Sequence, residues 1–391
     1  MTIEGKQTGT ARRRLRLGMV GGGRGAFIGA VHRMAARLDD RYELVAGALS
    51  SDPARAKESG ADLFLAPDRC YASWQEMARA EAARDDGIDV VAIVTPNHMH
   101  HGPAKAFLEA GIDVICDKPL TTAVEDAEDL AVTVGRTGRA FVLTHNYTGY
   151  PMVRQARAMI AAGAVGRIRV VQVEYPQDWL TTRIEEDGQK QAAWRTDPSR
   201  SGVAGCVGDI GTHAFNLAEF VTGLRCEALA ADLTSFVEGR ALDDNAHMML
   251  RFAGGARGML WASQVAPGCE NGLKLRVYGE KGGLEWRQEH PNQLRHAPFG
   301  EPPREIARGS HGAGPEAAHA TRIPSGHPEG YLEAFAQIYR DAADLIEARS
   351  AGRKPDAAAA LLPTVQDGVR GVRFIHAAVS SARQGATWID F

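Results

Sequence analysis

The chain has 391 residues, 44% hydrophobic and 24% charged, with a formal net charge of −3. That length exceeds what one hydrophobic core usually serves, so two domains are expected. The balanced charge excludes a general attraction to nucleic acid or to an anionic membrane, and no apolar run approaches a membrane span in length. Five scattered cysteines without a Cys-x-x-Cys pair favour reduced thiols over a disulfide framework or a zinc site.

Arginines at positions 12, 13 and 14 precede a short apolar stretch, which raises the alternative of a twin-arginine export signal. The apolar part is too short for the hydrophobic region of such a signal before three glycines interrupt it. We therefore expect residues 1–14 to form a flexible tail and the protein to be cytoplasmic.

The first part of the chain, residues 1–149, alternates short apolar runs with segments of helical length. Strands are expected at 15–20, 42–49, 89–95, 112–117 and 140–146. Two of the intervening helical segments, 101–111 and 123–138, end in glycine. Apolar strands that alternate with helices predict a doubly wound parallel sheet of the Rossmann type, covered on both faces.

The second part, residues 150–391, has a different pattern. Alternating apolar residues and glycine turns at 168–175, 246–263 and 273–286 favour antiparallel strands and hairpins. Residues 287–326, rich in Pro, Gly and His, are expected to form a long loop. Two amphipathic helices are expected at 330–348 and 365–382. This part therefore predicts an α+β domain with a large, mostly antiparallel sheet.

A glycine-rich segment, GMVGGGRGAFIG at 18–29, follows the first expected strand and opens a helix, as a dinucleotide-binding fingerprint requires. Gly21, Gly23 and Ala26 fit GxGxxA, whereas Gly29 fits the point where the helix starts against the sheet. Small residues let backbone N–H groups approach a pyrophosphate; the alternative is a glycine-rich turn without a ligand. The residues expected to bind the cofactor here are Gly21, Gly23, Arg24, Gly25, Ala26, Phe27 and Ile28.

The end of the second strand bears on the choice between NAD and NADP. An acidic residue that would hold a ribose hydroxyl is replaced by Ser50 and Ser51, with Asp52 slightly later. Arg55 could pair with a 2′-phosphate, and Asp52 could equally cap the next helix. NADP is therefore possible, NAD is not excluded, and the cofactor is expected to be one of the two.

The segment TPNHMHH at 95–101 follows the third strand, at the carboxyl edge where doubly wound sheets bind ligands. Its three histidines suggest a metal site, but no cysteine or carboxylate accompanies them locally. We expect no metal there, and instead expect Thr95, Asn97 and His100 to contact the nicotinamide ribose.

Taken in order, GMVGGG, TPNHMHHGPAKAFLEAGIDVICDKPL, WRTDPSRSG and GDIGTHAFNL resemble the Gfo/Idh/MocA oxidoreductases, named for glucose-fructose oxidoreductase and inositol dehydrogenase. The resemblance runs from about residue 15 to the last helix. It implies hydride transfer between a nicotinamide cofactor and a sugar, a sugar derivative or an inositol-type polyol. It also implies that Lys118 contacts both the nicotinamide and the substrate.

This sequence departs from the family pattern at three positions. The usual Glu-Lys-Pro is Asp117-Lys118-Pro119, which shortens the carboxylate beside the lysine by one methylene. Asn216 replaces the last aspartate of the motif that holds Asp209 and His213. Thr148 replaces an arginine in the segment of Asn146, so a positive charge near substrate or cofactor is absent there. Asp117 and Asn146 are still expected to bind the cofactor.

The expected chemistry needs a hydride acceptor and a group that takes the hydroxyl proton. A lysine beside a cationic nicotinamide ring is desolvated and repelled, so it gives up its proton more readily. His213 is the alternative proton carrier, and Asp209 could orient it from four residues away on one helix face. Lys118, His213 and Asp209 are therefore the expected catalytic residues, and the choice between the two proton carriers stays open.

The expected substrate pocket has hydrogen-bonding and aromatic groups without a strong cluster of positive charge. This favours a neutral polyhydroxylated ring over a phosphorylated sugar. Arg195 could hold a substrate oxygen or a cofactor phosphate, or form a surface ion pair. The expected substrate-binding residues are Lys118, Tyr147, Trp194, Arg195, Asp209, His213 and Tyr331, with Tyr175 and Trp179 as further aromatic neighbours.

Two other functions remain open from the sequence: a glycosidase that oxidises its substrate transiently with bound NAD, and a sensor that binds NAD(P) without catalysis. The resemblance also implies a homodimer or homotetramer formed through the open sheet of the second domain. Finally, a cis Lys118–Pro119 peptide bond is expected where the chain leaves the strand.

Overall fold

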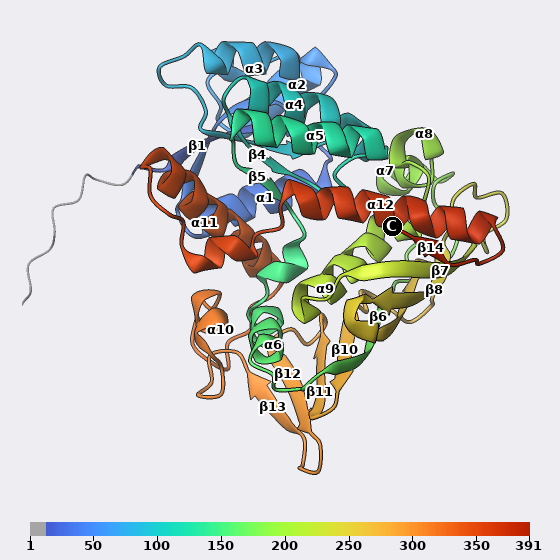
Figure 1. The fold of residues 1–391 in the computed structure, drawn as a ribbon. Helices are drawn as coiled ribbons and strands as arrows, with labels where there is room; N and C mark the ends of the chain where they lie inside the picture. The colour runs from blue at the N-terminus through green and yellow to red at the C-terminus, as the bar shows by residue number, and fades with distance from the viewer. Residues whose placement is uncertain (1–12) are drawn as a thin grey trace, which may run out of the picture.

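The structure is a computed structural model that describes residues 13–391. Nearly all of the predicted tail at 1–14 lies outside the described residues. Two sheets dominate the fold, one of five strands and one of nine (Figure 1). The Gfo/Idh/MocA-like fold class predicted above, a Rossmann sheet followed by a mostly antiparallel one, is confirmed.

The five strands of the first sheet run parallel in the order β2-β1-β3-β4-β5. The central strand is buried along its whole length, because its sequence VVAIV offers apolar side chains to both faces. All five predicted strands are confirmed. Their bounds are β1 Leu15–Gly21, β2 Tyr42–Ala48, β3 Val90–Val94, β4 Asp113–Cys116 and β5 Phe141–Leu143.

Helices cover both faces of this sheet, as the doubly wound pattern predicts. One face packs against α1 (Phe27–Leu38) and against α11 (Tyr331–Ser350), which comes from much later in the chain. The other face packs against helices that follow β2, β3 and β4. These are α3 Trp74–Ala82, α4 His101–Glu109 and α5 Val124–Thr137, while α2 spans Pro53–Asp62.

The second sheet has the order β13-β12-β11-β10-β6-β9-β8-β7-β14. Its neighbouring strands are antiparallel except for β6 and β9, which pair in parallel. The strands are β6 Ile168–Pro176, β7 Cys226–Thr234, β8 Asn245–Phe252, β9 Arg257–Ser263, β10 Lys274–Gly279, β11 Gly282–Arg287, β12 Gln293–Pro298, β13 Arg304–Ala307 and β14 Ile389–Asp390.

The expectation of one long loop at 287–326 is wrong. This segment contains the strand β12, the edge strand β13 and the short helix α10 (Pro315–His319). Pairing with β11 holds β12 in the sheet, and a buried Arg308–Glu329 ion pair anchors the chain beyond β13. Only β13 lies at the edge of the sheet, with β12 as its single partner, and this end of the sheet tolerates the Pro and His residues that suggested a loop.

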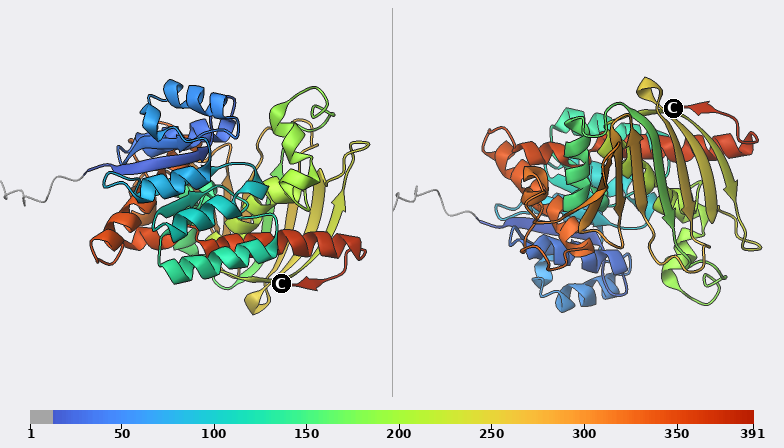
Figure 2. Two further views of the ribbon diagram at one scale, coloured as in Figure 1. Left: turned by 90° about the horizontal axis from the view of Figure 1, so that it is seen from above. Right: turned by 90° about the horizontal axis from the view of Figure 1, so that it is seen from below.

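The inner face of the second sheet packs against helices, whereas no helix of residues 13–391 covers the outer face (Figure 2). Along β8 the burial alternates because every second side chain points outward. The covering helices are α6 Pro151–Ala161, α9 Thr212–Thr222 and α12 Val365–Arg383. Helix α12 also packs against α5, so it joins the two sheets (Figure 1).

The two predicted C-terminal helices are confirmed as α11 and α12. Between β6 and α9, a strap formed by residues 177–205 carries the short helices α7 (Lys190–Arg195) and α8 (Pro198–Ser201). Within residues 13–391, no helix is both long and apolar enough to cross a bilayer.

Candidate active site

Lys118 lies two residues beyond the end of β4, at the carboxyl edge of the Rossmann sheet. Its Nζ donates to Oδ1 of Asp209 at 3.1 Å and also to the backbone carbonyl of Asp209. Both side chains are nearly buried, at 12% and 15% exposure. Lys118 and Asp209 are 91 positions apart in the sequence, and they were predicted to share one site. In the structure their side chains are in direct contact.

Asp209 is the centre of a cluster of hydrogen-bond donors. Its Oδ2 accepts from Nε of Arg195 at 3.1 Å and from Nε2 of Gln264 at 2.9 Å. Burial alone would raise the pKa of Asp209, but the positive charges of Arg195 and Lys118 outweigh it and hold that pKa well below its usual range. The carboxylate therefore stays ionised and fixes both cations.

His213 lies in the first turn of α9 and is 8% exposed. Its ring meets the edges of Tyr147 and His145, with centroids 4.8 and 5.5 Å away. Burial, and then the nearby charge of Lys118, hold the pKa of His213 well below its ordinary value, so the imidazole is neutral. Its Nδ1 is buried without a hydrogen-bond partner.

The predicted orientation of His213 by Asp209 stays a prediction, because no hydrogen bond joins these two side chains among the described residues. Asp209 lies in a π-helical turn, Val207–Gly211, that precedes α9. From there its carboxylate binds Lys118 and Arg195, which form stronger charge-assisted hydrogen bonds than a neutral imidazole would. Single π-turns of this kind often occur at functional sites.

Asp117 orients the backbone beside the lysine. Its Oδ1 accepts from the N–H of Lys118 at 3.0 Å and from the hydroxyl of Thr144 at 2.8 Å. The Lys118–Pro119 peptide bond is cis, as predicted. His100 braces the same turn from the neighbouring loop, since its ring nitrogens lie 2.8 Å from the carbonyl of Pro119 and 2.9 Å from that of Thr95.

The other residues of the TPNHMHH loop, of which Asn97 was a predicted site residue, form separate contacts. Asn97 is buried and donates to the carbonyl of Ser201, which ties the loop to α8. His98 is exposed, and His101 pairs with Asp129 at 2.6 Å. In the described part of the chain, no group of three or more His, Cys, Asp or Glu side chains is arranged to hold a metal ion.

The glycine-rich loop has the geometry of a dinucleotide cradle. Gly21 and Gly25 have φ of +79° and +75°, which only glycine adopts without strain. A Cβ on Gly29 would lie 2.4 Å from Cα of Gly22, so helix α1 starts in direct contact with the loop. Ala26 precedes α1, and its side chain does not cap the free N–H groups of the first turn. These residues fit a pyrophosphate at the helix N-terminus.

Charged and polar residues flank this cradle. Arg24, predicted to bind the cofactor, forms ion pairs with Glu58 and Asp62 of α2. Asp52 caps α2 by accepting from the N–H of Arg55 at 3.0 Å, the structural alternative considered above. Two further predicted residues, Ser51 and Phe27, are exposed, and Ser50 accepts a hydrogen bond from the N–H of Asp52. The predicted Ile28 lies beside Phe27 in the first turn of α1.

Asn146 is a second residue whose surroundings fit a bound cofactor. It lies just beyond β5, only 1% exposed, and its Nδ2 has no hydrogen-bond partner. An unsatisfied buried amide costs free energy, so such a group is usually completed by a ligand or water. Together with the glycine cradle, this orphaned donor fits a nicotinamide cofactor across the carboxyl edge of the sheet.

Aromatic and amide groups surround the charged cluster. The guanidinium of Arg195 lies 4.3 Å from the ring centroid of Trp194 and 6.0 Å from that of Trp179. Tyr147 is buried and hydrogen-bonded to the hydroxyl of Tyr175, and burial raises the pKa of Tyr147 to about 12.

The last predicted substrate residue, Tyr331, begins α11 and is partly buried. Burial raises its pKa well above the ordinary value, and the charges of Asp117 and Asp209 act in the same direction. Of the predicted polar residues, the structure brings Lys118 and Arg195 into direct contact with one carboxylate, that of Asp209.

Several residues of the site were not predicted from the sequence. Gln264 follows β9, and Asn271 accepts from the hydroxyl of Tyr175 at 2.7 Å. His145 precedes Asn146 and packs against His213. No local motif marks these residues, because tertiary pairing of β6 with β9 brings Tyr175 and Gln264 to one edge.

The first domain is a Rossmann sheet with a glycine cradle, and the second domain supplies Asp209 and His213 to the site of Lys118. This combination defines a nicotinamide-dependent oxidoreductase. Two family models support this class. Residues 15–147 match the oxidoreductase family with an NAD-binding Rossmann fold, and residues 153–285 match the Gfo/Idh/MocA C-terminal domain. The chain belongs to the Gfo/Idh/MocA family of oxidoreductases and binds NAD(P).

Solved structures resemble the whole chain. An oxidoreductase from Sinorhizobium meliloti is 56% identical, with a TM-score of 0.88 over 96% of this chain and 99% of that chain. An inositol dehydrogenase homolog from Azotobacter vinelandii, solved with NAD+, is 39% identical, with a TM-score of 0.92 over 97% and 98%. Levoglucosan dehydrogenase from Pseudarthrobacter phenanthrenivorans is 29% identical over 72% of this chain and 75% of its own length.

Proposed function

We propose that this protein oxidises a secondary hydroxyl of a neutral cyclic polyol of the inositol type, or reduces the matching ketone, with NAD(P). The observation that carries the proposal is the cluster of Lys118, Asp209 and Arg195 beside the neutral imidazole of His213. Such a site offers one group that polarises an oxygen and one that takes a proton.

The glycine-rich loop and Asn146 would hold a nicotinamide cofactor, which would supply the hydride-transfer chemistry. The ammonium of Lys118, held by Asp209, donates to the reacting oxygen and stabilises negative charge as it develops. His213 accepts the hydroxyl proton. Because Nδ1 of His213 is buried, Nε2 is the nitrogen that meets the substrate. Asp209 acts by positioning, since it remains ionised throughout.

Charge balance supports an uncharged substrate. Both cations of the cluster, Lys118 and Arg195, are already paired with Asp209. A phosphorylated sugar would need cations that are not neutralised in this way. The nearby amides of Gln264 and Asn271 and the hydroxyl of Tyr175 instead suit the hydroxyls of a polyol. The inositol dehydrogenase homolog from Azotobacter vinelandii was also solved with NADH and myo-inositol, which favours the inositol class.

The test is a substrate screen by absorbance of reduced nicotinamide, with NAD and NADP in parallel. The panel holds inositol isomers, levoglucosan and free sugars, with a phosphorylated sugar as the charged control. We expect activity with at least one inositol and none with the phosphorylated compound. Release of free sugar from glycosides without net NADH would support the redox-assisted glycosidase instead, and cofactor binding without any turnover would support the sensor.

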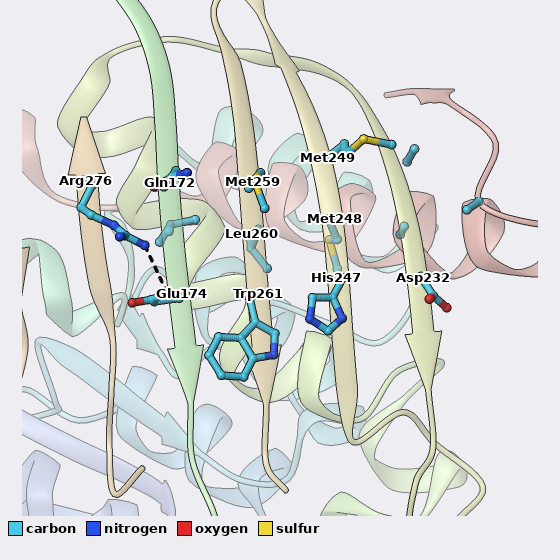
Figure 3. Close-up of a pocket in the computed structure, with 14 residues that line it drawn as sticks. Gln172, Glu174, Asp232, His247, Met248, Met249, Met259, Leu260, Trp261 and Arg276 are labelled. Atoms are coloured by element: carbon cyan, nitrogen blue, oxygen red, sulfur yellow. Dashed lines mark hydrogen bonds and ion pairs between the residues drawn. The ribbon is translucent and has the colours of Figure 1, made fainter. Parts of the chain in front are cut away.

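We further propose a homodimer or homotetramer that covers the outer face of the nine-stranded sheet. Met249 and Met259 are paired across β8 and β9 on this face and are 53% and 58% exposed. Beside them Trp261 stacks with His247 over a shallow hollow (Figure 3). Large exposed apolar side chains gathered on one face favour a partner subunit. A cytoplasmic location is proposed as well, from the free cysteines.

A further inference from the structure

Lys190 reaches from the second domain to the glycine-rich loop of the first. It begins α7, and its Nζ lies 3.7 Å from the position that a Cβ on Gly25 would occupy. No other heavy atom outside the neighbouring residues lies within 4 Å of that position. The ammonium therefore stands over the turn where the loop leads into α1.

The side chain of Lys190 differs from those of the two other cations at the loop, Arg24 and Arg33, which already have bonding partners. Arg24 is neutralised by Glu58 and Asp62, and Arg33 donates to the carbonyl of Gly22 at 2.6 Å. Within residues 13–391, Lys190 has no hydrogen bond or ion pair, and its side chain is exposed. A solvated ammonium beside an anion-binding cradle is ready to meet a phosphate.

We propose that Lys190 binds the pyrophosphate of the cofactor and so fastens the strap, residues 177–205, over the bound dinucleotide. The other end of the same helix carries Arg195, which pairs with Asp209. Helix α7 thus touches the phosphate site through Lys190 and the catalytic carboxylate through Arg195. Cofactor binding would thereby help to order the side of the site that faces the substrate.

This inference rests on cofactor binding and is independent of the substrate proposed above. The experiment titrates NADH by fluorescence into the full chain and into Lys190→Ala, Lys190→Arg and Lys281→Ala. Lys281, an exposed lysine in the turn between β10 and β11, is the matched control. We expect Lys190→Ala to weaken NADH binding about 10-fold, as loss of one charged hydrogen bond does, while Lys190→Arg and Lys281→Ala stay within about 2-fold of the parent.

Two further measurements identify the phosphate as the group that is bound. ADP-ribose keeps the pyrophosphate and should lose the same affinity in Lys190→Ala, whereas adenosine should lose none. The difference between parent and Lys190→Ala should also shrink at high salt. Bound ADP-ribose should slow trypsin cleavage after Lys190 in the parent chain. Unchanged NADH affinity in Lys190→Ala at low salt, or an equal loss for adenosine, would overturn the proposal.

Discussion

The two sheets of this protein solve the problem of burial differently. In the Rossmann sheet, β3 is covered on both faces, and every residue of VVAIV is buried. In the nine-stranded sheet, β8 alternates between buried and exposed residues, because only the inner face is covered by helices. The first sheet is therefore covered by helices on both faces, which we call the closed core, and the second is covered on its inner face only, which leaves an open outer face (Figure 2).

Both sheets nevertheless present carboxyl ends of parallel strands to the site. In the Rossmann sheet every strand does so, and β4 leads directly into Lys118. In the second sheet only β6 and β9 are parallel, and their ends lead to Tyr175 and Gln264. A single parallel pair in an otherwise antiparallel sheet thus supplies polar groups opposite the lysine.

The largest effect is expected where a charge enters the closed core. Val91→Asp places a carboxylate in β3, where Val91 is 0% exposed and lies within an apolar cluster. An unpaired buried charge costs about 4 kcal/mol or more, so this variant should fail to fold at 37 °C. Soluble yield and the urea midpoint measure the effect. A normal midpoint would mean that this face of the sheet is open to water.

Lys118 tests the contribution of the Rossmann edge to catalysis. Lys118→Ala should lower kcat by about 10³-fold, because it removes the donor to the reacting oxygen. Lys118→Arg should not restore the rate, since a planar guanidinium cannot replace a compact ammonium in the same hydrogen bonds. Stopped-flow turnover on the best substrate of the screen gives kcat, and NADH titration checks that the fold is kept. Activity within 10-fold of the parent would contradict the proposed mechanism.

The strands of the Rossmann sheet could be predicted from the sequence more completely than those of the nine-stranded sheet. The strands of the Rossmann sheet are continuous apolar runs, so all five were predicted, and the motif around Lys118 is local. The strands β12 and β13 were missed, because the segment that contains them, 287–326, is rich in Pro, Gly and His and resembles a loop when the partner strands are not known. Pairing across a sheet is a tertiary property that short patterns do not carry.

The candidate site divides in the same way. Lys118, Asp209 and His213 lie in motifs and were predicted together, whereas Gln264 and His145 have no local signal. The wider π-turn that holds Asp209 could not be predicted from a four-residue spacing either. That spacing suggested that Asp209 orients His213, which stays a prediction, and the hydrogen bonds of the carboxylate in the structure are with two cations and an amide.

Gln264 tests the contribution of the second sheet. Gln264→Leu removes the amide that donates to Oδ2 of Asp209 and leaves that oxygen with Arg195 alone. We expect kcat to fall about 10-fold, the value of one charged hydrogen bond in a positioned group. Gln172→Leu, on the outer face of β6, is the matched control and should leave kcat unchanged. Equal rates for both variants would show that β9 does not position the carboxylate.

Buried histidines predict that the closed core is sensitive to acid. Burial lowers the pKa of His32 to about 4, and that of His145 likewise to about 4. The unfolded chain binds protons below about pH 6.5 and the native chain does not, so stability falls as pH drops from 6.5 toward 4. Each such histidine adds at most about 1.4 kcal/mol per pH unit to this slope.

His32→Asn should remove one histidine from that slope while keeping a partner for the hydroxyl of Tyr339, 2.8 Å from the parent ring. Urea unfolding at pH 7.5 and pH 5 measures the difference in the free energy of unfolding. The variant should lose less stability than the parent between these two values. An unchanged pH dependence would mean that His32 is protonated in the native state.

The smallest effect on stability is expected on the open outer face of the nine-stranded sheet. Met259→Glu introduces the same kind of charge as Val91→Asp, but at a side chain that is 58% exposed. The free energy of unfolding of the single chain should change by less than about 0.5 kcal/mol. Sedimentation velocity should instead show dissociation, because two copies would bring like charges together across the covered face. Leu260→Glu, one residue along β9 and 1% exposed, should unfold the chain rather than dissociate it. If parent and Met259→Glu sediment alike, the partner subunit does not bind this face, and the exposed methionines need another explanation.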